Sequence, residues 1–377
     1  MADEVQNGVL AAWRELSGQS TCPQPIPRRY RLSVIPTPPV TPPSTSPPAY
    51  RLPALPHLRF RITFRASRPA RLVPFHGSML RGAFGHALKR AVCALPREPL
   101  CSECRLRHDC AYAQIFETPI EKAGPRGTPP LLQGATTAPH PYLFEPHSQA
   151  AQLPEGGELA FDLILFGRAV GYQGRALWAV EKMAEAGLGA GRTRFVLDRV
   201  EAEEAPGAFR TLCSGSSWQT SELLPGRPLP DSPLPGGGRS LRLQVVTPLR
   251  LQERGRIVPP RDPRALVFSA IRRLLELAHF HAPDPTIDWA FRPLLDAAST
   301  VRFAETSLRF EDLARYSQRQ DRQVQLGGYV GTLDLEGDLA PLGSLLRVAE
   351  VIHLGKGAVF GLGHIALGKE GQSPRPQ

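Results

Sequence analysis

Four cysteines, Cys93, Cys101, Cys104 and Cys110, lie within eighteen residues of one another and have the spacing of a metal site. The central C-x-x-C pair lets two thiolates bind one tetrahedral ion from a tight turn, and the flanking pair completes a four-sulfur shell. His108 is an alternative ligand. Because four protein ligands leave no open position, the pattern predicts structural rather than catalytic zinc. The alternative is a set of free thiols.

A histidine with basic neighbours is the best candidate for proton transfer. In LRGAFGHALKR the apolar residues share one helical face, and His86 lies on the opposite face. Gly82 and Arg90 are its i−4 and i+4 neighbours and Lys89 is at i+3. The glycine leaves space for a backbone to approach, while the cations attract phosphate and keep the imidazole neutral. Such a base could deprotonate a ribose 2′-OH. The alternatives are an exposed histidine without function, and His76 as the base.

Two further segments have the composition of phosphate-binding loops. GKGAVFGLGH carries Lys356 and four glycines whose amides could converge on phosphate oxygens, namely Gly355, Gly357, Gly361 and Gly363. No Ser or Thr follows the lysine, so the segment is not a P-loop. RYSQRQDRQ interleaves Tyr316 with arginines that suit a single-stranded or hairpin RNA: Arg315, Arg319 and Arg322. The alternatives are a glycine-rich turn and a solvated loop.

The charge balance favours a polyanionic partner. The chain has 377 residues, a formal net charge of +10 and a pI of about 9.7. Such a surplus indicates nucleic acid first and an anionic membrane second. Arginine far outnumbers lysine, as a GC-rich genome would also produce, but that bias does not explain the net charge.

Other classes of protein are disfavoured by what the sequence lacks. No apolar run approaches the ~20 residues that span a bilayer, and the N-terminus has no signal-peptide pattern. We therefore expect a cytoplasmic, reducing location, where clustered cysteines bind metal more often than they pair. No G-x-S-x-G, H-E-x-x-H, dinucleotide fingerprint or carboxylate cluster for magnesium is present. A nuclease of this sequence would use side chains and the 2′-OH of its RNA.

The elements that position these residues form two similar series. LRFRITFRAS alternates apolar residues with Arg59, Arg61 and Arg65 and predicts a strand with a basic outer face. The order strand, helix, strands, helix, strand follows, and it recurs after residue 240, where Asp262 is the expected N-cap of a long helix. We therefore predict an α+β fold with two tandem ferredoxin-like (RRM-like) domains.

We expect five segments along the chain. A proline-rich, disordered segment covers residues 1–56, and a first domain covers 57–213 with the cysteine insert at 93–110. A linker at 214–239 leads to a second domain at 240–370, which ends in the glycine-rich loop, and a tail follows at 371–377.

The order of motifs resembles that of a known family. LRGAFGHAL, C-x-x-C, DCAYAQIFE, PHPYLFEP, GLGAGRTRF, GGYVGTLDLEGDL and HLGKGAVFGLGHI follow one another over roughly residues 57–368. Over this range the chain is similar to the CRISPR-associated precursor-RNA-processing endoribonucleases of the RAMP superfamily. The proline-rich N-terminus and the cysteine insert depart from the simplest members.

The resemblance implies a reaction and a set of residues. It implies tandem ferredoxin-like domains and cleavage of precursor crRNA without a catalytic metal, leaving a 2′,3′-cyclic phosphate and a 5′-hydroxyl. His86 fits the place of the family's base, with Tyr316 and Lys356 as candidate helpers. The RNA contacts expected on this basis are Arg81, Lys89, Arg90, Arg315, Arg319, Gly355, Gly357, Gly361 and Gly363. The expected partners are repeat RNA and a CRISPR effector complex, with no membrane.

Two other functions stay open. One is a RAMP subunit that holds guide RNA in an effector complex without cutting it. The other is a zinc-containing nucleic-acid-binding module outside CRISPR systems.

Overall fold

The computed structural model describes residues 52–73, 75–95, 100–101, 103–118, 138–215, 217–219, 222–234, 238–283, 289–317 and 322–368. The chain divides into two compact units, Met1–Thr45 and Ser46–Gln377. The first unit lies outside the described residues, and so does most of the predicted disordered segment. All the structure reported for this protein belongs to the second unit.

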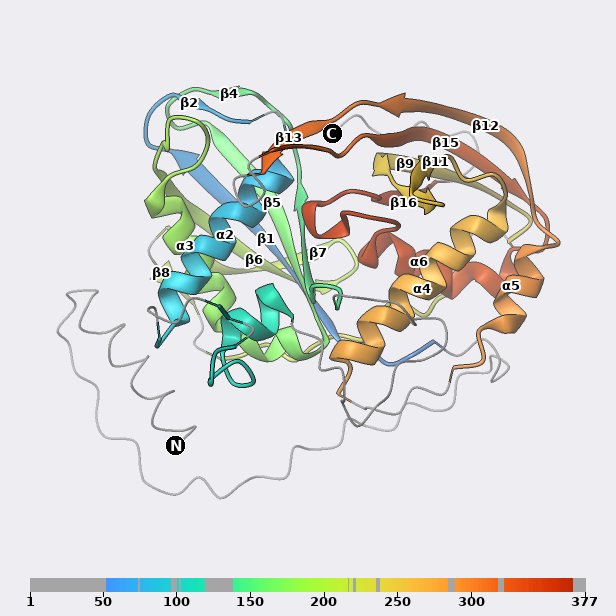
Figure 1. The fold of residues 1–377 in the computed structure, drawn as a ribbon, viewed down its shortest axis with the longest axis horizontal. Coiled ribbons are helices and arrows are strands. Elements are labelled where there is room, and N and C mark those ends of the chain that lie inside the picture. Colours follow the sequence, from blue (N-terminus) through green and yellow to red (C-terminus); the bar gives the residue numbers. More distant parts are fainter. Residues whose placement is uncertain are drawn as a thin grey trace, which may run out of the picture. The chain divides into compact units, whose positions relative to one another are not determined.

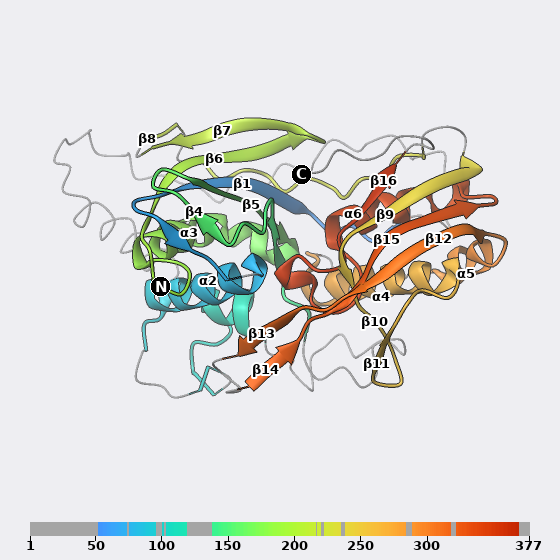
Figure 2. The same cartoon turned by 90° about the horizontal axis from the view of Figure 1, so that it is seen from above.

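The first module of this unit has the element order β-α-β-β-α-β. Its strands are β1 (His57–Ala66), β3 (Tyr142–Pro146), β5 (Glu158–Phe166) and β6 (Phe195–Ala205). They form an antiparallel sheet in the order β3-β5-β1-β6, which β7 (Ala208–Ser214) and β8 (Ser217–Trp218) extend. Helices α2 (His76–Val92) and α3 (Gln173–Ala186) cover one face of the sheet (Figure 2). The predicted order of elements is confirmed here.

Period-two alternation in β1 explains why the helices lie on that face. Phe60, Ile62 and Phe64 are fully buried and join one hydrophobic core with Leu80 and Phe84 of α2. Side chains of a strand alternate between its two faces, so the arginines of β1 occupy the other face. The apolar stripe of α2 thus covers the apolar face of the sheet.

The second module repeats this order. Its sheet has the order β12-β15-β9-β16, formed by β9 (Ser240–Leu249), β12 (Arg302–Glu311), β15 (Gly328–Glu336) and β16 (Ile365–Gly368). Its two main helices are α4 (Pro263–His281) and α6 (Gly343–Ile352). The predicted N-cap is confirmed, because the side chain of Asp262 accepts a hydrogen bond of 2.8 Å from the amide of Ala265.

The short elements complete the description. They are β2 (Ala70–Arg71), a π-helical turn (Ala113–Glu117), β4 (Gln152–Leu153), a 3-10 turn (Gly167–Tyr172), β10 (Leu251–Glu253), β11 (Arg256–Val258), α5 (Arg292–Ala298), β13 (Ala314–Ser317), β14 (Arg322–Gln325) and two 3-10 turns (Ala340–Leu342 and Ala358–Phe360). Among the described helices, none combines the length and apolarity that a membrane span requires.

The two modules lie side by side (Figure 1). Their apolar side chains pack into one shared cluster. Leu143, Ile164 and Phe166 of the first sheet belong to the same buried cluster as the helices of the second module. Leu55 is also buried in this cluster, so ordered structure begins before the first predicted domain. Within the predicted linker, Leu229 and Leu234 are buried in the cluster too.

Candidate nucleic-acid interface

The arginines of β1 are neutralised by carboxylates. Arg59 donates to Glu145 and Asp162 at 2.9 Å each, and Arg61 donates to Asp162 at 3.1 Å. The third, Arg65, contacts Glu158 at 2.8 Å and Asp198 at 2.9 Å. The basic outer face that the sequence predicts for this strand is therefore occupied by ion pairs within the sheet. The partner carboxylates lie far away in the sequence and come together only through sheet pairing.

The glycine-rich loop, residues 354–363, is a well-defined structure between α6 and β16. Gly355, Gly357, Gly361 and Gly363 all have φ between 71° and 89°, a region that favours glycine. Backbone bonds hold the loop to the second module: the Lys356 amide donates to the Arg250 carbonyl at 3.0 Å, for example. The Lys356 side chain is exposed.

This loop is seated on the first turn of α2. A Cβ on Gly77 would lie 1.8 Å from the carbonyl oxygen of Phe360, so only glycine allows so close an approach. Gly361 lies similarly close to strand β3, because a Cβ there would be 2.5 Å from the Phe144 carbonyl oxygen. A Cβ on Gly82, where sequence reasoning placed a backbone approach, would meet nothing within 4 Å.

Arg81 stands where the loop meets α2. Its guanidinium lies over the rings of Phe116, 4.4 Å from the centroid, and Phe360, at 5.3 Å. It also donates to Nε2 of His140 at 3.0 Å. Burial, reinforced by Arg81, lowers the pKa of His140 to about 3, so this imidazole is neutral. Arg81 forms no ion pair with any described residue, which leaves its charge available to an anion.

The hairpin of β13 and β14 begins at the same place. Its flanking residues Leu313 and Leu326 pack with Phe75 and Leu362, so the base of the hairpin, the loop and the start of α2 share a small apolar cluster. Tyr316 and its neighbour Arg315 belong to the hairpin, of which only the backbone is described there. Arg319 lies outside the described residues.

The two candidate bases have different surroundings. His86 is exposed on α2. It lies nine residues after Gly77, which places it on the opposite side of the helix and about 13 Å further along. His76 is fully buried, its Nε2 is 3.1 Å from the Ala150 carbonyl, and burial lowers its pKa. The structure thus brings neither histidine into contact with Lys356.

The remaining basic residues of α2 lie toward its C-terminal end. Lys89 lies over the ring of Tyr112, 5.6 Å from its centroid, and Arg90 is exposed. The helix contains no Asp or Glu, so its surface is positively charged.

The four clustered cysteines line one cavity of about 20 Å³, together with Lys89 and Arg107. A space of this size holds a single ion or water molecule. Burial raises the pKa of Cys101, against the opposing effect of Lys89. Among the described residues no three of the four sulfur atoms lie within 4.8 Å of one another, so an ion would have to draw them together. His108 does not line the cavity.

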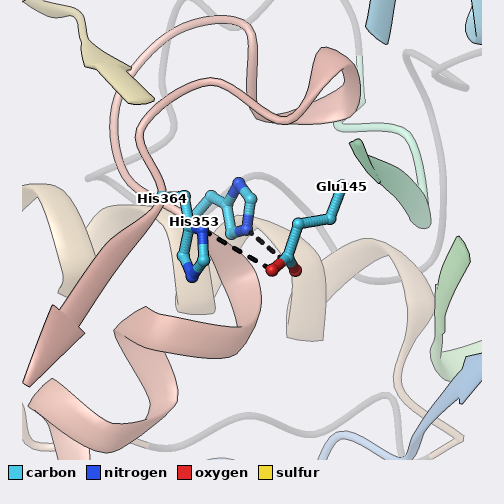
Figure 3. Close-up of side chains that lie close together, drawn as sticks. All are labelled: Glu145, His353 and His364. Carbon is cyan, nitrogen blue, oxygen red and sulfur yellow. Dashed lines mark ion pairs between the residues drawn. The ribbon is translucent and has the colours of Figure 1, made fainter. Parts of the chain in front are cut away.

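A second cluster joins the two modules. Glu145 extends from β3 to His353 and His364, which flank the glycine-rich loop, at 3.6 Å and 3.5 Å (Figure 3). Their potential ligand atoms all lie within 4.8 Å of one another. Burial would raise the pKa of Glu145, but His364, Arg59 and His353 together hold it well below its usual range.

These three residue types bind metals, but their geometry favours an ion-pair cluster. The two imidazole rings are stacked, with planes 4° apart and centroids separated by 4.8 Å. A ligating nitrogen directs its lone pair within the ring plane, so two stacked rings do not both point at one ion. Arg59 also donates to Glu145 and places a cation beside the carboxylate.

Sequence reasoning missed Glu145, His353 and His140. PHPYLFEP and HLGKGAVFGLGH were recognised as motifs, but nothing in their spacing shows that they lie side by side. A buried glutamate at the end of an apolar strand was the available signal.

Two family models match parts of the chain. One, described as an N-terminal domain, matches residues 55–224, and the model of the CRISPR-associated endoribonuclease Cas6 matches residues 243–365. An uncharacterized protein of Archaeoglobus fulgidus is 29% identical over 119 residues, or 32% of this chain and 37% of that protein. The match thus spans little more than a third of that relative.

Several solved structures are similar in outline. A Cas6 product complex has a TM-score of 0.49 and 18% identity, covering 82% of this chain and 99% of that one. Thermus thermophilus Cas6 has a TM-score of 0.45 and 17% identity, with coverage of 83% and 99%. A partial Cas6-RT-Cas1–Cas2 complex has a TM-score of 0.48 and 12% identity, with coverage of 86% and 48%. The family likeness is thus carried by residues 243–365, which match the model of the CRISPR-associated endoribonuclease Cas6.

Proposed function

We propose that this protein is an endoribonuclease that binds CRISPR repeat RNA and cleaves precursor crRNA. The observation that carries the proposal is the contact of the glycine-rich loop with a helix that has no acidic residue, beside Arg81, which forms no ion pair with a described residue. Loop amides and cations are the groups that bind phosphate. The Cas6 family model, described as an endoribonuclease, supports the same function.

The proposed reaction needs no catalytic metal. A base takes the proton from a ribose 2′-OH, which attacks the adjacent phosphorus and expels the 5′-oxygen of the next nucleotide. The products are a 2′,3′-cyclic phosphate and a 5′-hydroxyl. His86 is the proposed base because it is exposed on α2, whereas His76 is buried with a carbonyl partner. Tyr316 and Lys356 are proposed helpers, and no described contact joins them to His86.

Single-turnover cleavage of a repeat RNA in EDTA tests this mechanism. His86→Ala should bind the RNA nearly normally and cut it on the order of 10²–10⁴ times more slowly. His76→Ala is the matched control. If it alone loses cutting, the base is His76; if both variants cut normally, the histidine mechanism is wrong.

The position of His86 also favours a second candidate, a subunit that holds guide RNA without cutting it. Because His86 lies across α2 from the loop contact, phosphate held at the loop and at Arg81 would not reach its imidazole without further bending of the RNA. Wild-type protein that binds repeat RNA tightly but yields no product, with or without EDTA, would establish this function.

We also propose that both modules are ferredoxin-like domains, and that the first holds structural zinc at Cys93, Cys101, Cys104 and Cys110. The strand orders β3-β5-β1-β6 and β12-β15-β9-β16 support the first proposal. The shared cavity supports the second. Association with a CRISPR effector complex and a cytoplasmic location stay predictions.

A further inference from the structure

The cluster of Glu145, His353 and His364 holds both ends of the glycine-rich loop. His353 follows α6 and His364 precedes β16, so one carboxylate of the first module faces the beginning and the end of a loop that belongs to the second (Figure 3). The loop's own hydrogen bonds run to the second module, for example from the Gly363 amide to the Pro248 carbonyl at 3.1 Å. Glu145 is thus a polar link between the loop and β3.

The hydrogen bonds of His353 define where its protons are. Its Nδ1 is 3.2 Å from the Leu362 carbonyl oxygen, which can only accept, so Nδ1 carries a proton. Its Nε2 is buried and has no hydrogen-bond partner, and it faces the Glu145 carboxylate. A neutral ring would direct a lone pair at a carboxylate oxygen and repel it. A protonated ring would donate to that oxygen and attract it.

The second imidazole does not compete for the proton. Burial lowers the pKa of His364 to about 4, with Glu145 opposing and His353 and Arg59 contributing to the shift. Two charged rings stacked 4.8 Å apart would also repel each other. The ionisable groups of the surrounding elements include Arg59 and Arg61 on β1, His147 after β3, Asp162 on β5, Glu203 on β6, Arg273 on α4, and Arg347 and Glu350 on α6.

We propose that Glu145 is a positioning residue which, by binding a protonated His353, fixes the glycine-rich loop against β3 and α2. The loop is then ordered where it would contact RNA, so this inference deepens and rests on the proposed function. The clamp requires an ionised Glu145 and a proton on Nε2 of His353. It weakens in acid, as the pH falls from the ordinary Glu pKa of 4.5 through the lower folded-state pKa.

Hydrogen exchange of the RNA-free protein tests the clamp directly. The observed amides are those of Leu354, Lys356 and Gly363, corrected for the intrinsic dependence of exchange on pH. Glu145→Gln keeps the shape and an acceptor for Arg59 but loses the charge. At pH 7 the three amides should be about tenfold less protected in this variant than in the wild type, because the loop loses a charge-assisted contact.

Two variants of the same network serve as controls. Glu203→Gln removes a carboxylate beside Arg59, and His147→Asn removes an imidazole that contacts Asp162 at 2.8 Å; neither touches the loop. Both should retain the loop protection of the wild type. Unchanged protection of the three amides in Glu145→Gln overturns the inference.

Repeat-RNA affinity gives the second measurement. At pH 7 the wild type should bind repeat RNA about tenfold more tightly than Glu145→Gln. If the wild type binds no repeat RNA while Glu145→Gln still loses loop protection, the proposed function is wrong and the clamp stands. If RNA binds and the two affinities are equal, Glu145 does not position the loop for RNA.

Discussion

Gly77 and Gly82 lie five residues apart on α2. Replacing each by alanine distinguishes the effect of the loop contact, which only Gly77 makes, from the effect of alanine on helix stability, which both share. A Cβ at Gly77 would lie 1.8 Å from the Phe360 carbonyl oxygen, whereas a Cβ at Gly82 would have no neighbour within 4 Å. Alanine is favoured over glycine by about 1 kcal/mol in a helix interior. We expect Gly82→Ala to raise the free energy of unfolding by about that amount.

The cost at Gly77 follows from the distance. Cβ contacts under 3.0 Å essentially do not occur, so the loop must move by about 1 Å or more to admit the methyl group. Overpacking of this kind costs about 1–3 kcal/mol. Gly77→Ala should therefore lower the free energy of unfolding by roughly that amount. It should also weaken RNA binding, because the loop loses its seat, while Gly82→Ala should leave RNA binding unchanged.

Urea unfolding followed by circular dichroism and RNA binding followed by anisotropy measure the two effects. If Gly77→Ala is as stable as the wild type and binds RNA as well, the loop is not seated on α2. If Gly82→Ala instead loses RNA binding, the RNA backbone approaches the helix at Gly82, as the sequence analysis suggests.

Three further outcomes are expected. Arg81→Ala should lower the slope of log affinity against log salt by about 0.7–0.9, the value of one phosphate contact, whereas Arg65→Ala should leave it unchanged because Arg65 is already paired; equal slopes for both would remove Arg81 from the interface. Protein purified without added zinc should contain about one zinc per chain, and Cys104→Ser should release it and loosen the first module; a stably folded, metal-free wild type would contradict the site. Asp262→Ala should cost about 1 kcal/mol of stability by urea unfolding, since it removes the N-cap of α4, and no loss would mean that the capping bond does not persist in solution.

The order of the elements could be read from the sequence because local patterns determine it. Alternation of Phe60, Ile62 and Phe64 with arginines identified β1, and the apolar stripe of α2 identified the helix. The candidate site could be read only in part. The glycine-rich loop can be predicted from its composition, but its contact with Gly77 depends on how the two modules pack.

The role of the β1 arginines shows the limit most clearly. A sequence records that Arg59 and Arg61 share a face, but not which carboxylates lie opposite them. Asp162 and Glu145 lie on other strands, more than eighty residues away, and their carboxylates form ion pairs with the arginines of the predicted basic face. An arginine that seems free in the sequence can be neutralised by a carboxylate on a neighbouring strand, and the strand register determines which residues lie opposite each other.

The shared apolar packing of the two modules has a consequence for how this chain can be cut or recombined. Leu143, Ile164 and Phe166 lie on the face of the first sheet that its own helices do not cover, and the second module buries them. In an excised first module these side chains would form an apolar patch exposed to water, and the module would aggregate. A chimera must therefore take both sides of this contact from the same protein. Unfolding of one module would also destabilise the other, because it exposes the apolar residues that the two modules bury together.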